Sequence, residues 1–188
     1  MEFIRKVYAF FIDIAQTLLL VFAVFLVVYI FLFRPFQVSG SSMYPNFVDK
    51  QYVLTNIITL RLNKPKHGDV IVFKAPPDPK KDYIKRVIGI SQDSVSIRDG
   101  SVYLNGKLLD QSKFLDPSVK TYGGSFLHEN ESVTVPDNEY FVMGDNRPES
   151  SDSREWGFVP VKLIIGESFF TYWPFDQIKI IKNPYKDK

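Results

Sequence analysis

A long apolar run near the N-terminus, IAQTLLLVFAVFLVVYIFLF at residues 14–33, is the feature that most constrains how this chain folds. The run has about 20 residues, one amide and no charge, and a helix of that length matches the roughly 30 Å hydrocarbon core of a bilayer. A helix at the surface of a soluble core carries its apolar residues on one stripe, whereas this run is apolar all round. We therefore predict a transmembrane helix at residues 14–33.

A cleavable signal peptide is the main alternative to a permanent anchor. Its apolar region is shorter, about 7–15 residues, and small residues follow it at the cleavage site. Here Arg34, Pro35 and Phe36 follow the run, so we predict that the helix is retained. The cations Arg5 and Lys6 favour a cytoplasmic N-terminus, but further cations on the other side leave this signal weak.

Composition narrows the classes of function. The net charge of +2 comes from intermixed acids and bases, which is not typical of a nucleic-acid-binding surface. The chain has no cysteine, so disulfides, thiol catalysis and cysteine-based zinc sites are excluded. The two histidines, His67 and His128, stand in unrelated contexts, so no metal site built from several imidazoles is expected. We predict no cofactor and no metal.

The chain after the anchor is predicted to form one mostly β domain. Short segments rich in β-branched and aromatic residues alternate with turn signals such as Asp99-Gly100 and Asn105-Gly106, and no long segment has the 3.6-residue period of an amphipathic helix. The predicted strands are residues 51–58, 69–73, 83–90, 94–97, 101–104, 132–135, 140–143, 164–170 and 177–181. We expect bent antiparallel sheets or a partial barrel, with a loop-rich excursion at residues 107–130.

Ser42 lies in the stretch SGSSMYP at residues 39–45, about nine residues beyond the apolar run. Such a length of chain spans at most roughly 30 Å, so this serine stays close to the membrane surface. Serine is a weak nucleophile at neutral pH and needs a base to take its proton. The usual base is histidine, but His67 has a turn-forming context and His128 a weakly patterned one, so a Ser-His-Asp triad has little support.

A neutral lysine is an alternative base. Lys85 lies in the predicted strand at residues 83–90, where alternation places it on the same face as Tyr83 and Val87. Burial on that face would lower the pKa of its amine. Most strand lysines instead extend their amine to solvent, and the strand pattern alone leaves both interpretations of Lys85 open.

A third segment, GDNRPESSDSREWG at residues 144–157, is dense in hydrogen-bonding groups directly after a predicted strand. This composition fits a polar surface loop. It also fits a rigid loop in which Asp152 pairs with Arg154 and Ser150 orients a base.

Four segments in this order resemble type I signal peptidases, the membrane-bound Ser/Lys proteases. They are SMYP at residues 42–45, KHGDVIVF at residues 66–73, YIKRVIG at residues 83–89 and the polar segment at residues 144–157. With the N-terminal anchor, the resemblance covers most of the chain. The single anchor is similar to that of the shorter forms found in Gram-positive-type bacteria.

The resemblance implies a role for each matched residue. Ser42 would be the nucleophile and Lys85 its general base, and the backbone N–H of Ser42 would stabilise the oxyanion. Some relatives place a serine two residues before the nucleophile as a second oxyanion donor, and Gly40 occupies that position here. The supporting residues would be Ser150, which orients the lysine, Asp152 and Arg154, which form a salt bridge, and Asp145, which shapes the active-site loop.

The implied reaction is the endoproteolytic removal of signal peptides from secreted preproteins at the outer membrane surface, after Ala-x-Ala-like sites. The preprotein would add as a strand beside residues 83–85, and Tyr83, Ile84 and Met43 would form substrate-binding walls. The expected partners are preproteins and the lipid bilayer, with the secretion translocon as a further partner and no nucleic acid.

The resemblance also implies where each part of the chain lies. The protein would be a single-pass cell-membrane protein with a short cytoplasmic N-terminus at residues 1–13 and a transmembrane anchor at residues 14–33. An extracytoplasmic β-rich peptidase domain would occupy residues 34–188.

Two other classes of protein share part of the pattern. Self-cleaving Ser/Lys repressors are soluble and carry a DNA-binding module, in place of which this chain has a membrane helix. A membrane-tethered β-rich binding module without catalysis would fit the anchor and the strands, but it would leave Ser42, Lys85 and Ser150 unexplained.

Overall fold

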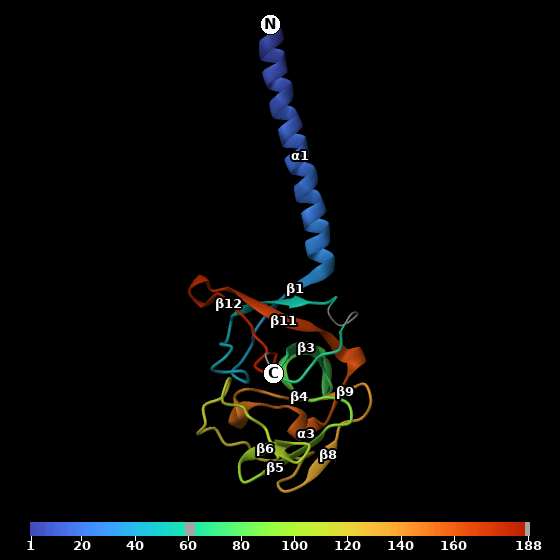
Figure 1. Ribbon diagram of the computed structural model, residues 1–188, viewed down its shortest axis with the longest axis vertical. Coiled ribbons are helices and arrows are strands. Elements are labelled where there is room, and N and C mark those ends of the chain that lie inside the picture. Colours follow the sequence, from blue (N-terminus) through green and yellow to red (C-terminus); the bar gives the residue numbers. More distant parts are fainter. Residues whose placement is uncertain (59–62, 187–188) are drawn as a thin grey trace.

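The long apolar run forms a single projecting helix. The computed structural model describes residues 1–58 and 63–186. Helix α1 (Glu2–Leu32) extends from one end of a mostly β domain (Figure 1), and its part Glu2–Val27 is long and apolar enough to cross a membrane. The helix includes the predicted N-terminal segment at residues 1–13 almost entirely, because no proline or glycine interrupts it there.

Strand β1 (Phe33–Gln37) begins directly where α1 ends and was not among the predicted strands. It pairs antiparallel with β2 (Tyr52–Asn56), with Pro35 opposite Leu54. Proline lacks a backbone N–H, which disfavours a strand prediction but is tolerated on an edge strand such as β1. This pairing attaches the end of α1 to the domain, and β1 ends at Gln37, two residues before Ser39.

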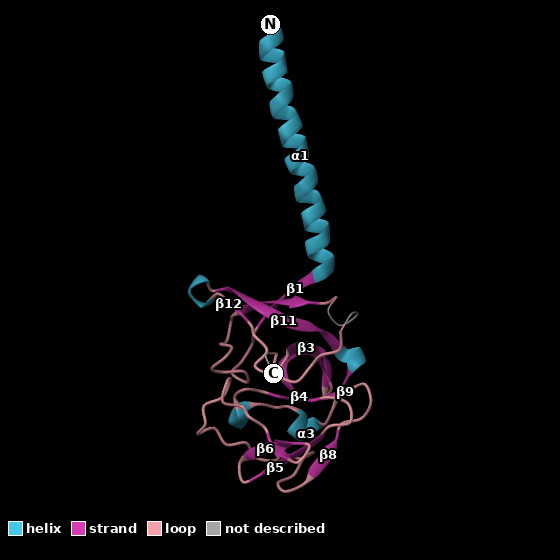
Figure 2. Cartoon of the chain, in the orientation of Figure 1, coloured by secondary structure: helices cyan, strands magenta, loops and turns pink. Residues whose placement is uncertain are grey.

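Two antiparallel sheets make up the domain in the described part of the chain (Figure 2). The larger sheet has the strand order β1-β2-β11-β3-β4-β9-β10, and β12 pairs with β11. Its remaining strands are β3 (Val70–Ala75), β4 (Asp78–Gly89), β9 (Glu139–Met143), β10 (Val159–Pro160), β11 (Ile164–Trp173) and β12 (Lys179–Ile180). The smaller sheet has the order β7-β6-β5-β8 and consists of β5 (Ser94–Arg98), β6 (Ser101–Leu104), β7 (Lys107–Leu108) and β8 (Ser132–Thr134).

The mostly β fold and the antiparallel pairing are as predicted, and each predicted strand is present, with the same ends at residues 101–104 and with shifted ends elsewhere. Strands β1, β7 and β10 are additional, and residues 109–130 contain no helix or strand, which confirms the predicted loop-rich excursion. Register shifts interrupt the pairing of β4 with β9 and of β11 with β2 and β3. Such bulges bend strands, which explains the curvature of the larger sheet.

Short helical turns lie between the strands, and the sequence did not predict them. They are η1 (Arg147–Glu149), α3 (Ser153–Trp156), η2 (Val161–Leu163) and η3 (Phe175–Gln177). Helix α3 forms inside the polar segment because the side chain of Asp152 caps it and accepts a hydrogen bond from the backbone N–H of Arg154.

Three apolar clusters form the core. One joins the two sheets and includes Ile88, Val95 and Phe141. A second lies on the larger sheet, around Ile71 and Val142. The third contains Val38, Met43, Phe47, Val53 and Val70, and it lies beneath the turn that carries Ser42.

Candidate active site

The turn that carries Ser42 follows β1 and is fastened to the domain. The backbone N–H of Gly40 donates to Asp49 Oδ1 (2.8 Å), and Gly40 has φ +88°, a conformation that a residue with a β-carbon adopts only at a cost. Met43 and Phe47 anchor the turn in the core. Ser42 is therefore held with its side chain directed away from the core.

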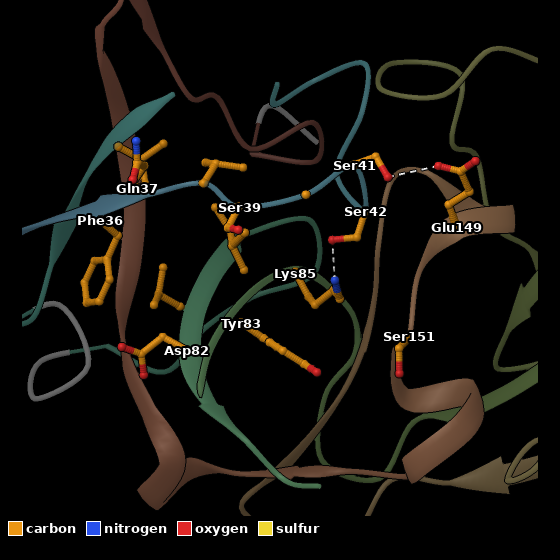
Figure 3. A pocket seen from close by; sticks show the side chains of 15 residues that line it. Phe36, Gln37, Ser39, Ser41, Ser42, Asp82, Tyr83, Lys85, Glu149 and Ser151 are labelled. Carbon is orange, nitrogen blue, oxygen red and sulfur yellow. Dashed lines mark hydrogen bonds between the residues drawn. The ribbon is translucent and has the colours of Figure 1, made fainter. Parts of the chain in front are cut away.

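The side chains of Lys85 and Ser42 point toward each other in the pocket drawn in Figure 3. The Lys85 amine donates a hydrogen bond of 2.6 Å to Ser42 Oγ. Lys85 lies on β4, where it pairs with Ile71 of β3, and only 4% of the residue is exposed. Of the two interpretations that the strand pattern left open, the structure supports the buried lysine and not the solvent-facing one.

Burial sets the electrostatics of this pair. It lowers the pKa of Lys85 from 10.5 to about 8, because desolvation disfavours the charged amine. The carboxylates of Asp152 and Asp145 act in the opposite direction and preserve part of the amine's basicity. A lysine with such a pKa can accept a proton near neutral pH.

The two histidines lie elsewhere. His67 Nε2 is 2.5 Å from Asp93 Oδ2, and its carbonyl accepts from the Asn183 side chain, so it belongs to a cluster that does not line the groove with Ser42. His128 lines a separate surface hollow near Asp99. A Ser-His-Asp triad at Ser42 is therefore excluded.

Asp152 and Arg154 form a buried ion pair, as the family resemblance implied. Arg154 Nε donates to Asp152 Oδ1 (2.8 Å) and Arg154 Nη2 to Asp152 Oδ2 (2.9 Å). Asp152 also accepts from the backbone N–H of Gly144, and Arg154 donates to the carbonyl of Arg147. These bonds fasten the two ends of the polar segment to each other, as expected for a rigid loop and not for a solvated one.

Asp145 holds the start of the same loop against β4. Its carboxylate accepts two hydrogen bonds from Arg86, of 2.8 and 2.6 Å, and a third from the side chain of Asn46 (2.9 Å). The Arg86 guanidinium also packs over the ring of Phe114 at 4.4 Å. Arg86 was not predicted as part of the site, and the sequence offers no sign that its side chain meets Asp145.

Arg147 was also missed by sequence reasoning. It is almost fully buried and donates to Thr121 Oγ1 (2.6 Å), to the carbonyl of Gly144 (3.1 Å) and to the side chain of Gln111. Burial lowers the pKa of Arg147 to about 10, so it remains cationic at neutral pH. Arg147 thus joins the polar segment at residues 144–157 to the loop-rich residues 109–130.

Ser150 lies close to Gly144 and the backbone of Ser42, but its side chain forms no hydrogen bond within the described residues. Its Oγ is buried and has no hydrogen-bond partner there, so the expected bond to Lys85 is not formed in this state. A β-carbon built at Gly144 would lie 2.2 Å from Ser150 Oγ and 2.3 Å from the carbonyl oxygen of Ser42. Ser150 is thus packed next to the backbone of Ser42 through a position where only glycine fits.

A groove of about 290 Å³ opens over Ser42 and Lys85 (Figure 3). Its lining consists of Phe36, Gln37, Val38, Ser39, Gly40, Ser41, Ser42, Val53, Val72, Asp82, Tyr83, Ile84, Lys85, Glu149 and Ser151. Tyr83 and Ile84 are thus in the wall, as the sequence predicted. Met43 is not, because its side chain points into the core and is only 1% exposed, which corrects the expectation that it forms a wall.

The backbone around Ser42 has one open donor. Its carbonyl accepts from the backbone N–H of Asn146 (3.0 Å), whereas its own N–H has no acceptor among the residues that the structure describes. Gly40 supplies no side-chain donor, as expected from the sequence. An N–H next to the nucleophile is the group that an oxyanion intermediate requires.

Comparisons with known proteins place the chain in a family. Residues 11–173 match the model of the family described as signal peptidase, peptidase S26. A probable signal peptidase I-2 of Synechocystis is 36% identical over 152 residues, which cover 78% of this chain and 66% of that protein. A signal peptidase IB of Staphylococcus aureus (strain MRSA252) is 33% identical over 178 residues, which cover 89% of this chain and 92% of that protein.

Among solved structures, a crystal structure of a signal peptidase I from Enterococcus faecalis V583 is 30% identical in sequence. The likeness covers 56% of this chain and 97% of that chain, with a TM-score of 0.44. The family model matches far more than half of the sequence and includes the anchor, the serine turn, β4 and the polar segment. The chain therefore belongs to the signal peptidase family, peptidase S26.

Proposed function

We propose that this chain is a serine endopeptidase that removes signal peptides from secreted preproteins with a Ser42–Lys85 dyad. The observation that carries the proposal is the 2.6 Å hydrogen bond between Lys85 Nζ and Ser42 Oγ in an open groove. With the pKa of Lys85 at about 8, about one molecule in ten has a neutral amine at pH 7. That fraction supplies the base that serine needs.

Each step of the proposed reaction has a residue that performs it. Neutral Lys85 takes the proton of Ser42 as Ser42 Oγ attacks the scissile carbonyl, and the Ser42 N–H donates to the resulting oxyanion. The C–N bond then breaks, and the Lys85 ammonium passes its proton to the leaving amine. Neutral Lys85 next deprotonates a water that attacks the acyl ester, and it returns this proton to Ser42 as the signal peptide leaves.

We assign supporting roles to four residues of the polar segment. The ion pair of Asp152 with Arg154 and the bonds of Asp145 to Arg86 hold the segment against β4, where Lys85 lies. Ser150 has a buried hydroxyl without a partner, close to Gly144 and the backbone of Ser42, and we assign it the orientation of the Lys85 amine, as the family resemblance implies.

The free edge of β4 supports binding of the preprotein as an added strand. Residues 82–85 pair with β3 on one side, whereas the pairing with β9 begins only at Arg86. An extended peptide can use the open edge for main-chain hydrogen bonds. The lining beside it is apolar and includes Val38, Val53 and Ile84, which suits small apolar side chains and supports a preference for Ala-x-Ala-like sites.

We infer that the domain works at the outer face of the membrane, with the N-terminus of α1 in the cytoplasm. The tip between β11 and β12 lies at the end of the domain where α1 is attached (Figure 1) and exposes Trp173, Phe175, Ile178 and Ile180. Aromatic side chains favour the membrane interface, so this tip supports a groove held close to the bilayer. A preprotein anchored by its signal helix would then meet the enzyme within the same surface layer.

The test is cleavage of a purified preprotein by the full-length chain in detergent or vesicles. We expect the wild type and His67→Ala to cut, because His67 is remote from the dyad, and we expect Ser42→Ala and Lys85→Ala to lose almost all activity. Full activity in either dyad variant would refute the mechanism. An inactive wild type that still binds preprotein would favour a membrane-tethered binding module instead.

A further inference from the structure

The groove has two chemically different halves on either side of Ser42. Figure 3 shows Phe36, Tyr83 and Asp82 on one side and Ser41 and Glu149 on the other, with Ser42 and Lys85 between them. The first half has the apolar lining and the free edge of β4. Under the proposed function, it receives the residues before the scissile bond. The half with Glu149 therefore faces the residues after that bond, which become the N-terminus of the mature protein.

Glu149 is held in place on that side through one of its two oxygens. Oε2 accepts from Ser41 Oγ (2.9 Å) and from Asn146 Nδ2 (3.3 Å). Ser41 is the residue directly before the nucleophile, so the carboxylate is fixed beside the reacting centre. Oε1 has no hydrogen-bond partner among the described residues, and the exposed side chain leaves it open to a ligand.

The two carboxylates in the lining of the groove, Glu149 and Asp82, differ in their ion pairing. Within the described part of the chain, Glu149 forms no ion pair, whereas Asp82 at the opposite end of the groove is paired with Lys74 (2.7 Å). The remaining charged residue of the lining is Lys85, whose amine donates to Ser42 and forms no ion pair with Glu149. Glu149 thus leaves a local negative charge where the residues after the scissile bond pass.

We propose that Glu149 determines specificity for the first two residues after the scissile bond, favouring Lys or Arg there and disfavouring Asp or Glu. The inference rests on the proposed function, because it needs a peptide cut at Ser42. Two opposite charges within a screening length of roughly 8 Å attract each other, and like charges repel each other to a similar degree. An exposed pair changes an equilibrium constant by about twofold to fivefold, so the preference is expected to be of that size.

The test uses one preprotein made in three forms that differ only in the two residues after the cut: Lys-Lys, Gln-Gln or Glu-Glu. The full-length wild type in detergent at low ionic strength is expected to give kcat/KM in the order Lys, Gln, Glu, with about a fivefold ratio between the extremes. Raising the salt to about 0.5 M should reduce this ratio toward one, because salt screens exposed charges. Glu149→Gln should abolish the ratio, and Glu149→Lys should invert it.

For each variant, kcat/KM on the Gln-Gln substrate is the reference, because this substrate has no charge at the two positions. Glu131→Gln removes an exposed carboxylate outside the groove and should keep the wild-type ratio. Equal kcat/KM on the three substrates in the wild type, or an unchanged ratio in Glu149→Gln, would overturn this inference alone. Failure of the wild type to cut any of the three substrates would overturn the proposed function and this inference with it.

Discussion

Lys85 shows how one residue combines a structural cost with a chemical use. It is a cation buried in β4, with its amine on the Ser42 hydroxyl, and burial lowers its pKa to about 8. The folded protein therefore holds this amine neutral over a pH range in which an exposed lysine is charged. The same desolvation that weakens the fold at neutral pH gives the amine the pKa that the proposed role as a base requires.

The pH profile of cleavage should follow the titration of Lys85. Below a pH of about 8 the amine is mostly protonated and cannot take the serine proton, so kcat/KM should rise with pH and reach half of its plateau near pH 8. The measurement is kcat/KM from pH 6 to 10, with circular dichroism to confirm folding at each pH. A rate that falls steadily from pH 6 to 9 in folded protein would contradict the assignment of Lys85 as base.

Lys85→Met should abolish cleavage and stabilise the protein. The pKa of Lys85 in the folded protein is below its unfolded value of 10.5, so between about pH 8 and 10.5 the unfolded chain binds more protons than the folded one. The buried amine therefore lowers the free energy of unfolding, and this destabilisation is complete below about pH 8. Replacement should raise the free energy of unfolding by roughly 1–3 kcal/mol at pH 7 and have little effect above about pH 10.5. Denaturant unfolding measures this free energy. The control is Lys162→Met at an exposed position, which should change the free energy of unfolding little.

The polar segment at residues 144–157 acts as one element that positions the site. Gly144 begins it between Ser42 and Ser150, Asp145 ties it to Arg86 on β4, and Asp152 caps α3. The side chains of Asp145, Arg147, Asp152 and Arg154 point inward and form hydrogen bonds within the domain. A loop built this way holds its geometry without an apolar core of its own.

Gly144→Ala should lower kcat sharply. The added methyl would lie 2.2 Å from Ser150 Oγ and 2.3 Å from the Ser42 carbonyl oxygen, and the latter is backbone that cannot rotate away. The serine turn and the polar segment must separate, so a loss of at least about tenfold in kcat is expected because such reactions depend on sub-ångström positioning. Wild-type kcat in this variant would show that the two segments are not in close contact during catalysis.

Breaking the ion pair between Arg86 and Asp145 should destabilise the domain. Both side chains are buried, so Asp145→Asn leaves the Arg86 charge without its counter-charge, at a cost of about 3–5 kcal/mol. The double variant Arg86→Met with Asp145→Asn should recover much of this loss. A double-mutant cycle by thermal or denaturant unfolding measures the interaction energy between Arg86 and Asp145. Additive effects of the two substitutions would show that the pair contributes no interaction energy.

The strands show which parts of an element can be predicted from sequence. Runs of β-branched residues located β3, β4, β9 and β11, because a half-buried strand needs alternation within a few residues. β1 was missed because its edge position, which makes Pro35 acceptable, depends on β2. Arg86 was missed for a similar reason, since its partner lies 59 residues away in sequence.

At the scale of the whole molecule, the membrane helix, the aromatic tip and the groove form one arrangement. α1 and the tip between β11 and β12 lie at the same end of the domain (Figure 1), and β1 links the helix to the turn of Ser42 through a few residues. Trp173 is 45% exposed and Phe175 is 73% exposed. Such side chains gain stability in the interfacial region of a bilayer.

Removing both aromatic rings of the tip should slow cleavage of membrane-bound substrate only. Trp173→Ala with Phe175→Ala should lower the rate on a preprotein reconstituted in vesicles by several-fold, because the groove is then held less firmly at the bilayer. The kcat/KM on a short soluble peptide should stay unchanged. Tyr122→Ala removes an exposed aromatic ring from the hollow next to the β5–β6 turn, at the far end of the domain, and should change neither rate. Equal losses on both substrates would contradict an interfacial role.

By itself, the sequence determined the apolar helix, the mostly β class and the small set of residues able to do the chemistry, because these depend on composition and on periods of a few residues. Only the tertiary structure decided that Lys85, 43 residues from Ser42, meets the serine and that His67 does not. It also decided that Met43 faces the core and that Glu149 lies beside the turn that carries Ser42. Contacts between distant segments depend on how the sheets bend and pack, and a pattern of a few neighbouring residues does not predict that geometry.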